Sequence, residues 1–369
     1  MRRTRRAAES VAAASATTPD PLEGLEAEGA LASVTSVASA RAARADTTLV
    51  RRDHGGGGAR SAALDLWLRA TVRPLIGVWT LAPHLPWPYH AVDHLGRLLR
   101  PLPGTTFDRI RLPHCPGTRV TTDAAATSGR TIVYLHGGAF LVGGNHLHRQ
   151  LLSRVAHRTG ATIIAPEYRK LPRHTVADAL EDAVDGYRYA LDHGAEPTRT
   201  VLMGDSAGGF LSVMLAIAIQ RAGLPAPAAV VALSPLVDFV ASDDVTYPGC
   251  TLFPRAAIGR FQQLAARVNQ RRGRGEDPIE SPTHAPRRGL PPVLVQVSSA
   301  ECLYADGVRL AETLAAAGVP VELEVWDKQV HVFQAAAGFV PEGREALENA
   351  ARFVERATGA EQVQQAVTA

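Results

Sequence analysis

The residues best suited to chemistry in this chain of 369 residues are a serine and the glycines around it. Ser206 lies in the run Gly204-Asp205-Ser206-Ala207-Gly208, between the apolar segments 200–203 and 210–217. A serine in a sharp strand-to-helix turn has a strained backbone, and the residues two before and two after it crowd together, so both must be glycine. This spacing predicts a nucleophile elbow that presents Ser206, with an ordinary glycine-rich turn as the alternative.

A second glycine-rich segment lies upstream of the serine. The run His136-Gly137-Gly138-Ala139-Phe140 directly follows the β-rich residues 131–135. In enzymes with a catalytic nucleophile elbow, an oxyanion hole binds the negatively charged oxygen that forms during the reaction. Its donors are backbone N–H groups of a loop after an earlier strand and the N–H of the residue that follows the nucleophile. Glycine lets such a loop present its amides without obstruction by side chains. Residues 136–140 are therefore a candidate oxyanion loop.

A serine nucleophile needs a general base, which follows it in the chain in this type of site. The histidines downstream of Ser206 are His284 and His331. His284 lies in a polar, arginine-rich insertion, where a structural or surface role is expected. His331 lies in a short loop after the strand-like residues 321–326, so it is the stronger candidate.

The acid that orients the base is expected in the loop after the apolar residues 293–297. This loop and its continuation offer two carboxylates, Glu301 and Asp306. Glu301 is near the predicted strand end, whereas Asp306 enters the next predicted helix, where an acid commonly stabilises the N-terminus. Either carboxylate could hold the imidazole tautomer and stabilise the imidazolium if the geometry allows.

The elements that must position these residues alternate between apolar strands and helices. Near-continuous apolar strands of this kind are typical of a parallel sheet covered on both faces. Only the first strands lack a helix between them, so they are expected to be antiparallel. The eight predicted strands are residues 107–112, 119–122, 131–135, 161–165, 200–203, 228–233, 293–297 and 321–325.

These segments together resemble the hormone-sensitive-lipase-like branch of the α/β-hydrolases. Members of that branch carry His-Gly-Gly-Gly-Phe/Trp and Gly-Asp-Ser-Ala-Gly-Gly at about this separation. Three further segments, 168–183, 233–238 and 290–295, also match the family in its order. The resemblance covers roughly residues 100–355. Ala139 in place of the third glycine, and Lys170-Leu171 in place of Leu-Ala, depart from the family pattern.

The resemblance implies an α/β-hydrolase fold, with a mostly parallel eight-stranded sheet, helices on both faces and a helical cap. The hydrolase domain would comprise residues 61–369. Its cap would come from about 61–105 and 239–285, where a helix is expected near 254–267.

The resemblance also assigns the site. The family places its base where His331 lies, and its acid about thirty residues earlier, which favours Glu301 over Asp306. By the same analogy, the N–H groups of Gly138, Ala139 and Ala207 form the oxyanion hole. The expected activity is that of a serine carboxylesterase, which hydrolyses short-to-medium acyl esters through an acyl-enzyme without a metal or cofactor.

Other activities use the same residues on this fold. A deacetylase of a secondary metabolite is a narrower hydrolase, and an acyltransferase or a lyase could retain the whole triad. A ligand receptor, as in the plant gibberellin receptors that resemble these hydrolases, typically loses the triad histidine, so His331 argues against it. The expected partner is a small ester, and an oligomer is compatible with the sequence.

Composition narrows the remaining possibilities. A formal net charge of +3, with acids and bases interspersed, does not point to nucleic acid. Three cysteines, Cys115, Cys250 and Cys302, lie far apart without metal-ligand spacing, which favours free thiols and a cytoplasmic location. Residues 1–60 are rich in Arg and Ala and end near four glycines, so we predict a disordered tail with a glycine linker.

The segment 64–87 is expected to form an amphipathic helix of the cap. Charges and prolines interrupt its apolar run, so it does not predict a membrane-spanning helix. Contact of this helix with a membrane surface is the less favoured interpretation. The apolar residues expected on its inner face are Leu66, Leu68, Val72, Leu75, Ile76 and Trp79.

Overall fold

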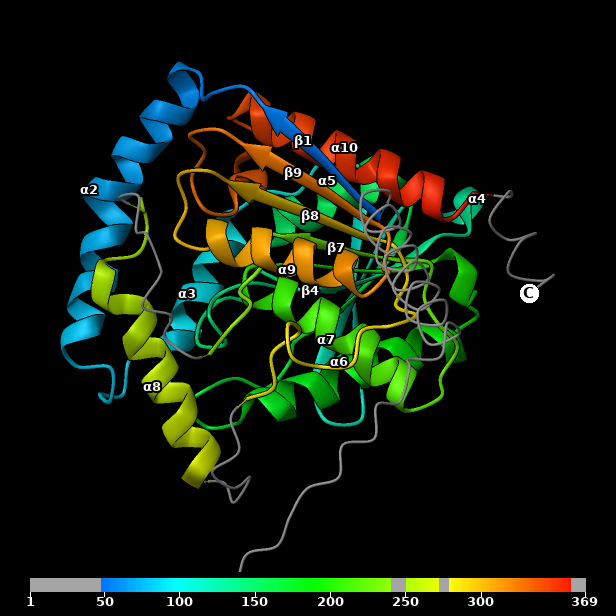
Figure 1. The fold of residues 1–369 in the computed structure, drawn as a ribbon, viewed down its shortest axis with the longest axis horizontal. Helices are drawn as coiled ribbons and strands as arrows, with labels where there is room; N and C mark the ends of the chain where they lie inside the picture. Colours follow the sequence, from blue (N-terminus) through cyan, green and yellow to red (C-terminus); the bar gives the residue numbers. More distant parts are fainter. Residues whose placement is uncertain (1–47, 240–249, 272–278, 360–369) are drawn as a thin grey trace, which may run out of the picture. The chain divides into compact units, whose positions relative to one another are not determined.

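A single twisted sheet organises the residues that the computed structural model describes, which are 48–239, 250–271 and 279–359. The sheet has nine strands in the order β1-β9-β8-β7-β6-β4-β5-β3-β2 (Figure 1). Its strands are β1 (Leu49–His54), β2 (Thr105–Arg111), β3 (Pro116–Thr122), β4 (Thr131–Leu135), β5 (Thr162–Pro166), β6 (Thr200–Asp205), β7 (Ala229–Leu233), β8 (Val293–Ser298) and β9 (Val321–Trp326).

Strand directions agree with the sequence pattern. Strand β3 is antiparallel to both β2 and β5, whereas every other pair in the sheet is parallel. The hairpin between β2 and β3 leaves no room for a crossover helix, while parallel neighbours require one. The α/β-hydrolase fold class is therefore confirmed, as is the antiparallel pairing of the first two predicted strands, which are β2 and β3.

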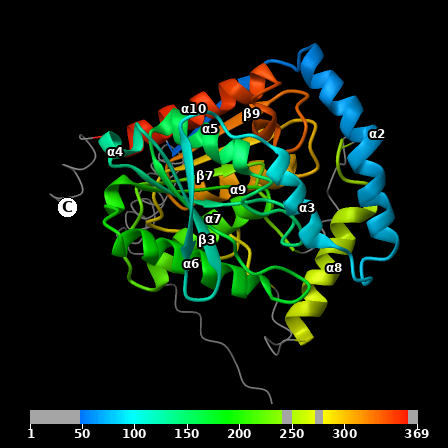
Figure 2. The ribbon, with the colours of Figure 1, turned by 180° about the vertical axis from the view of Figure 1, so that it is seen from behind.

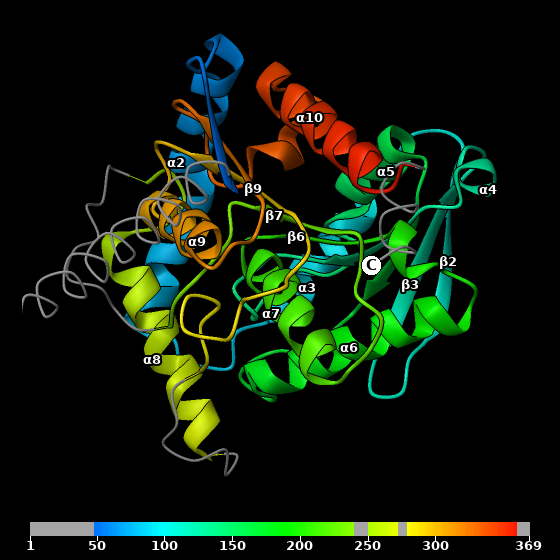
Figure 3. The same cartoon turned by 45° about the vertical axis from the view of Figure 1, so that its right-hand side comes forward.

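Helices cover both faces of the sheet, and successive side chains of each strand point alternately to one face and the other. On β4, Ile132 and Tyr134 face the side of α5 (Arg149–Thr159) and α10 (Pro341–Ala357). Val133 and Leu135 face the opposite side. That side is covered by α6 (Val176–Asp192), α7 (Ala207–Arg221) and α9 (Tyr304–Ala316), as Figure 3 shows. Because both faces are covered, the central strands β4 to β8 are mostly apolar.

Strand β1 corrects two sequence-based predictions. The sheet has nine strands rather than eight, and the predicted disordered tail of residues 1–60 reaches too far. Strand β1 pairs in parallel with β9, its His54 ring stacks on Trp326 at 3.9 Å, and the N–H of Gly58 donates to Glu342 at 2.7 Å. The strand lies at the sheet edge with exposed residues between its ends, so it lacks the apolar pattern that reveals a buried strand. Residues 1–47 lie outside the described residues.

The cap is built from helices at the carboxyl ends of the parallel strands (Figures 1 and 2). It comprises α2 (Ala59–Leu81), α3 (Tyr89–Leu95), the 3-10 turn η1 (Gly96–Leu98) and α8 (Arg255–Arg271). Helix α8 includes the helix expected near 254–267. The expected cap ranges also contain residues 240–249 and 272–278, which lie outside the described residues.

Shorter elements outside the cap are α4 (Ala125–Ser128), η2 (Pro197–Arg199) and η3 (Phe333–Ala336).

Helix α2 follows the amphipathic prediction only in part. Leu68, Val72, Ile76 and Trp79 are half-buried, as residues of an inner face should be. Leu66 and Leu75, expected on its inner face, are each 69% exposed. The reason is that polar side chains of α2 point inward and are used there: Asp65 accepts a hydrogen bond from Thr251, and Arg73 donates to the carbonyl of Cys250. In the described part of the chain, no helix is both long and apolar enough to cross a membrane.

Candidate active site

The predicted nucleophile lies in a strained turn between β6 and α7. Ser206 has φ 53° and ψ −117°, a conformation that non-glycine residues rarely adopt. A Cβ on Gly204 would lie 2.3 Å from the carbonyl oxygen of Gly208, and one on Gly208 would lie 1.8 Å from that of Leu135. The crowding that the spacing predicted is therefore present on both sides of Ser206.

The structure brings the three sequence-predicted triad residues together. The Oγ of Ser206 lies 3.0 Å from Nε2 of His331, and Nδ1 of His331 forms a short hydrogen bond with Oε2 of Glu301. The other carboxylate oxygen of Glu301 accepts the N–H of Ser298 at 2.8 Å. Since all three catalytic candidates are buried, the hydrogen bonds that join the carboxylate, the imidazole and the hydroxyl are shielded from water.

Asp306, the alternative acid, lies elsewhere. It occupies the first turn of α9, where its carboxylate accepts a hydrogen bond from Arg309 at 2.8 Å. The same guanidinium also binds Asp238 at 2.6 Å. Burial raises the pKa of Asp306 to about 6 against the lowering effect of Arg309. This arrangement joins α9 to the segment after β7 and leaves Glu301 as the carboxylate on His331.

The electrostatics of His331 suit a base that becomes charged during a reaction. Burial lowers the pKa of His331, but its hydrogen bond to Glu301 and the charge of that carboxylate outweigh burial, so the pKa is raised. The ring of Phe253, in the residues before α8, meets the imidazole edge-on with centroids 5.3 Å apart. The cap therefore contributes an apolar wall beside the imidazole.

The candidate oxyanion loop follows β4 in an unusual backbone conformation. Gly138 has φ 116°, and Ala139 and Phe140 also have positive φ values of 53° and 54°. A Cβ on Gly138 would lie 2.2 Å from the carbonyl oxygen of Val142, so only glycine fits there. Among the hydrogen bonds of the described residues, none uses the backbone N–H of Gly138, Ala139 or Ala207. Three donors are thus available to a ligand oxygen.

A buried polar network that sequence reasoning missed holds this loop against the elbow. The Oδ1 of Asp205, the residue before the nucleophile, accepts the hydroxyl of Tyr134 at 2.8 Å and the N–H of Gly137 at 3.0 Å. Its Oδ2 lies 3.3 Å from Nε2 of His148, which is itself buried. No local pattern in the sequence marks His148, because its partner Asp205 is 57 residues away.

The Asp205–His148 contact is a buried ion pair. Burial lowers the pKa of His148, but the negative charge of Asp205 and the hydrogen bond to its carboxylate outweigh burial, so the pKa is raised overall. For Asp205, burial acts to raise the pKa, and the charge of His148 together with the hydrogen bonds it accepts outweighs that effect. Both shifts favour the charged form of the group, so the contact behind the candidate oxyanion loop favours an ion pair.

Two further contacts hold the same loop from the segment after β5. The hydroxyl of Tyr168 donates to the carbonyl of His136 at 2.6 Å. The ammonium group of Lys170, one of the departures from the family pattern, donates to the carbonyl of Gly143 at 3.0 Å. Lys170 therefore adds a link to the loop that the sequence alone did not suggest.

A cluster of four phenylalanines fills the space beside the elbow. Phe140 of the loop packs on Phe210 of α7 and on Phe261 of α8, with ring centroids 6.0 and 6.5 Å apart. Phe239, after β7, contacts all three, with centroids between 5.2 and 5.9 Å apart. The rings are buried, so they limit the room for a substrate chain on this side.

The remaining candidates lie away from Ser206. His284 is exposed and contacts the Thr283 hydroxyl. One group among the described residues has ligand atoms close enough for a metal ion: His114, Asp182 and Asp185. Asp182 is bound by Arg169, and Asp185 lies 2.7 Å from His114, so these carboxylates already have cationic or hydrogen-bonding partners.

Comparison with known proteins places the chain in a family. Residues 132–335 match the family described as having the alpha/beta hydrolase fold. The chain therefore belongs to the α/β-hydrolase fold family. Its relatives indicate which branch of that family it resembles.

Esterase LipU of Mycobacterium tuberculosis (strain ATCC 25618 / H37Rv) is 37% identical over 297 residues, which cover 78% of this chain and 99% of LipU. An acetyl-hydrolase of Streptomyces hygroscopicus is 38% identical over 257 residues, covering 68% of this chain and 83% of that protein. The crystal structure of an esterase from the bacterial hormone-sensitive lipase family matches with a TM-score of 0.67 at 30% identity, covering 78% of this chain and 98% of that one. The resemblance to the hormone-sensitive-lipase-like branch of ester hydrolases is confirmed.

Proposed function

We propose that this protein is a serine carboxylesterase in which Ser206 is the nucleophile, His331 the general base and acid, and Glu301 the residue that orients His331. The observation that carries the proposal is the unbroken set of contacts from Glu301 through His331 to Ser206 Oγ. The strained backbone of Ser206 adds support, since such strain persists at functional sites.

In the acylation half of the reaction, Ser206 Oγ attacks the ester carbonyl carbon while Nε2 of His331 accepts the hydroxyl proton. The carbonyl oxygen becomes an oxyanion, which the N–H groups of Gly138, Ala139 and Ala207 hold. The bond to the leaving alcohol then breaks, and His331 returns its proton to the departing oxygen. The product of this step is an acyl ester on Ser206.

In the deacylation half, water attacks the acyl carbon and His331 accepts the proton of that water. The same three N–H groups hold the second oxyanion. When the intermediate collapses, Ser206 Oγ leaves and regains its proton from His331, releasing a carboxylic acid. Throughout both halves, Glu301 keeps Nδ1 of His331 protonated and stabilises the imidazolium.

The substrates we propose are small esters with short-to-medium acyl chains. The four buried phenylalanines beside the elbow support this size limit, because they occupy space that a long acyl chain would need. The similarity to an acetyl-hydrolase agrees with it and also favours a second candidate, the removal of acetyl groups from a larger metabolite. We propose a cytoplasmic location, which Cys115, Cys250 and Cys302 support, since all three are buried and none forms a disulfide.

A panel of p-nitrophenyl esters from C2 to C16 tests the proposal. We expect turnover to be highest between about C2 and C8. Ser206→Ala and His331→Ala should each lower kcat by about 10⁴ to 10⁶, since triad members act as a unit. The matched controls are Ser212→Ala, a buried serine farther along α7, and His284→Ala, an exposed histidine; both should stay within about threefold of wild type.

Thermal melts of each variant establish that it is folded. A fluorophosphonate probe should add its mass to the wild-type protein and not to Ser206→Ala. More than a tenth of wild-type activity in a folded Ser206→Ala or His331→Ala variant would contradict the assignment. Folded wild-type protein without turnover on any ester, but labelled by the probe, would favour the acyltransferase or lyase alternative.

A further inference from the structure

Helix α2 presents an outer face that no described part of the chain covers. Five large apolar side chains on this face are between 54 and 82% exposed. We call Leu66, Trp67, Leu75, Val78 and Leu81 the α2 outer face. Water-facing sides of cap helices are normally polar, and a helix that is apolar all round is normally buried on every side. A face of this kind marks an interaction surface.

Contacts on the inner side of α2 fix this orientation. Asp65 is hydrogen-bonded to Thr251, Arg73 reaches the carbonyl of Cys250, and Trp79 donates its indole N–H to Tyr89 at 3.0 Å. These polar groups would be the natural ones to turn toward water. Because they are used inside the cap, rotating α2 to hide its outer face would break all three contacts.

The charge of the cap limits what can cover the outer face. The described cap segments, 59–100 and 250–271, contain nine arginines and two aspartates, with no lysine or glutamate. Asp93 is buried, where it accepts the N–H of Leu147 at 3.0 Å, and Asp65 is bound to Thr251 and Arg69. The charge that these described segments present to solvent is therefore positive, although the whole chain has a formal net charge of only +3.

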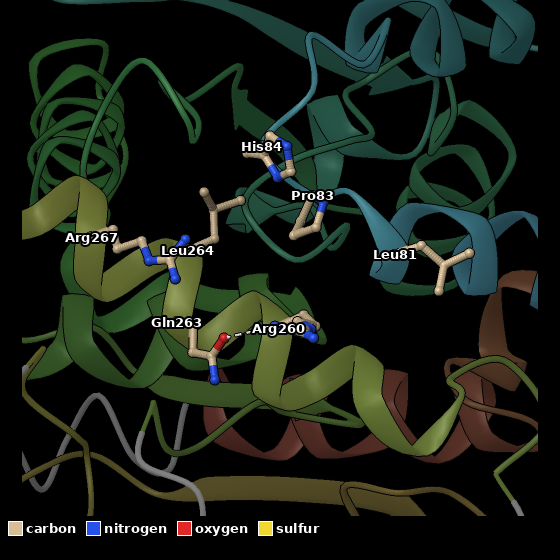
Figure 4. Close-up of a pocket in the computed structure, with 7 residues that line it drawn as sticks. All are labelled: Leu81, Pro83, His84, Arg260, Gln263, Leu264 and Arg267. Atoms are coloured by element: carbon tan, nitrogen blue, oxygen red, sulfur yellow. Dashed lines mark hydrogen bonds between the residues drawn. The ribbon is translucent and has the colours of Figure 1, made fainter.

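An arginine-lined cavity adjoins one end of the outer face. It has a volume of about 160 Å³ and lies between the end of α2 and helix α8. Figure 4 shows Arg260, Gln263, Leu264 and Arg267 of α8 on one side, across from Pro83 and His84, with Leu81 at the end of α2. Cationic groups beside an exposed leucine match a surface that is anionic at its headgroups and apolar just beneath them.

We propose that the α2 outer face docks on the surface of an anionic lipid membrane, with Arg260 and Arg267 of the adjoining cavity toward the phosphates of the headgroups. A second copy of the chain fits less well, because a two-fold contact repeats the same patch on both partners and would bring arginines together. The membrane supplies both an apolar layer for the five side chains and opposite charge for the arginines. The cap lies at the carboxyl ends of the parallel strands (Figure 1), where Ser206 follows β6, so docking through it would bring this end of the sheet near a source of lipid-soluble esters.

Flotation of the full-length protein with vesicles tests the docking directly. One set of vesicles is phosphatidylcholine alone, and the other contains about 30% phosphatidylglycerol. We expect binding to the second set at 0.1 M salt, weaker binding at 0.5 M salt because charge is screened, and little binding to the first set. The measurement uses no substrate, so it can fail or succeed independently of the proposed esterase function.

Two variants and two matched controls locate the surface. Trp67→Glu/Val78→Glu should weaken binding to anionic vesicles at least tenfold, and Arg260→Gln/Arg267→Gln should weaken it by about fivefold per arginine. Val50→Glu on β1 and Arg109→Gln on β2 make the same kinds of change at exposed positions away from the cap, and should bind as wild type. All four should keep their thermal transition and their turnover of a soluble C2 ester.

Three results would overturn the proposal. The first is no binding of the folded wild-type protein to anionic vesicles. The second is equal binding to both sets of vesicles, which would remove the role of the arginines. The third is a dimer, measured by light scattering, that Trp67→Glu/Val78→Glu dissociates while vesicle binding stays unchanged; this would assign the outer face to a second copy of the chain.

Discussion

The elbow and oxyanion loop are held in a different way from the cap that covers them. Asp205 is buried, and its carboxylate joins Tyr134, Gly137 and His148 into one network in which each group has a partner. In the cap, Asp65 is only half-buried and contacts Arg69 and Thr251. The same residue type thus stabilises a fixed geometry in one region and attaches a helix in the other.

The difference follows from what each region must do. Donors to an oxyanion are effective only if they are oriented before the reaction, so the loop tolerates little movement. A cap must admit and release substrate, and the elements that move in proteins are generally the less stable ones. We therefore expect substitutions near the loop to change rate and stability strongly, and equivalent substitutions in the cap to change them little.

The largest expected effect comes from the acid of the proposed triad. Glu301→Gln removes the charge that stabilises the imidazolium and allows an amide N–H to face Nδ1 of His331. In serine proteases with a Ser-His-Asp triad, the corresponding acid-to-amide change costs about 10⁴ in kcat, and we expect a loss of at least about 10² here. Steady-state kinetics on a C4 ester measures it.

Asp306→Asn is the matched control for that variant, because Asp306 contacts Arg309 rather than His331. It should keep kcat within about threefold. Because burial outweighs the ion pair with Arg309 and raises the pKa of Asp306, removing the charge should change the free energy of unfolding by less than about 1 kcal/mol. If Asp306→Asn were inactive and Glu301→Gln active, with both folded, the acid of the triad would have to be reassigned.

The second prediction compares Asp205→Asn with Asp65→Asn. Asp205→Asn leaves His148 buried without its charged partner, which typically costs about 3–5 kcal/mol, and loosens the loop, so we expect kcat to fall about tenfold to a hundredfold. Asp65→Asn keeps a hydrogen-bond acceptor for Thr251 and should cost less than about 1 kcal/mol, with kcat within twofold. Denaturant unfolding and C4-ester kinetics measure both variants.

The ion pair also gives this comparison a dependence on pH. The raised pKa of His148 contributes stability that is complete below about 6.5, its unfolded value, and is lost as pH rises through the folded value. The lowered pKa of Asp205 contributes stability that is complete above about 3.9 and is lost as pH falls. The stability difference between wild type and Asp205→Asn should therefore be largest between these values. A difference that falls neither above this range nor below it would contradict the ion pair.

Sequence reasoning recovered what short-range crowding and apolar patterning determine. The glycines at 204 and 208 have no room for a Cβ, and this requirement is visible in the motif itself. The apolar runs of β4 to β9 marked strands because these strands are almost wholly buried. Strand β1 was missed because an edge strand with exposed residues has no such pattern, and His148 was missed because only the fold brings it to Asp205. The direction in which α2 faces depends on Thr251 and Cys250, distant in the sequence, so its outer face could not be predicted either.

The third prediction concerns the base of the proposed triad. His331 must be neutral to accept a proton, and its pKa is raised because Glu301 outweighs the opposing effect of burial. The acid limb of kcat/KM against pH should therefore have its midpoint above about 6.5, with about a tenfold loss per pH unit below it. In Glu301→Gln the midpoint should move to lower pH. A wild-type midpoint below 6.5, on a substrate that does not titrate, would contradict the effect of Glu301.

The smallest expected effect lies at Ala139, where the chain departs from the family's third glycine. Ala139 has φ 53°, a region that glycine adopts freely and alanine at a cost of about 1 kcal/mol. Ala139→Gly should therefore relieve strain. That gain is partly offset because glycine gives the unfolded chain more freedom, so we expect a change in the free energy of unfolding of under about 1 kcal/mol. Since the N–H at 139 is retained, kcat on a C2 ester should stay within about threefold.

Ala139→Val is the matched opposite, because a β-branched side chain at positive φ is a severe outlier that should distort the loop and lower kcat at least tenfold. If both variants matched wild type in kinetics and thermal melts, the backbone conformation at 139 would have no part in holding the oxyanion, and the rigidity that we ascribe to this loop would not extend past Gly138.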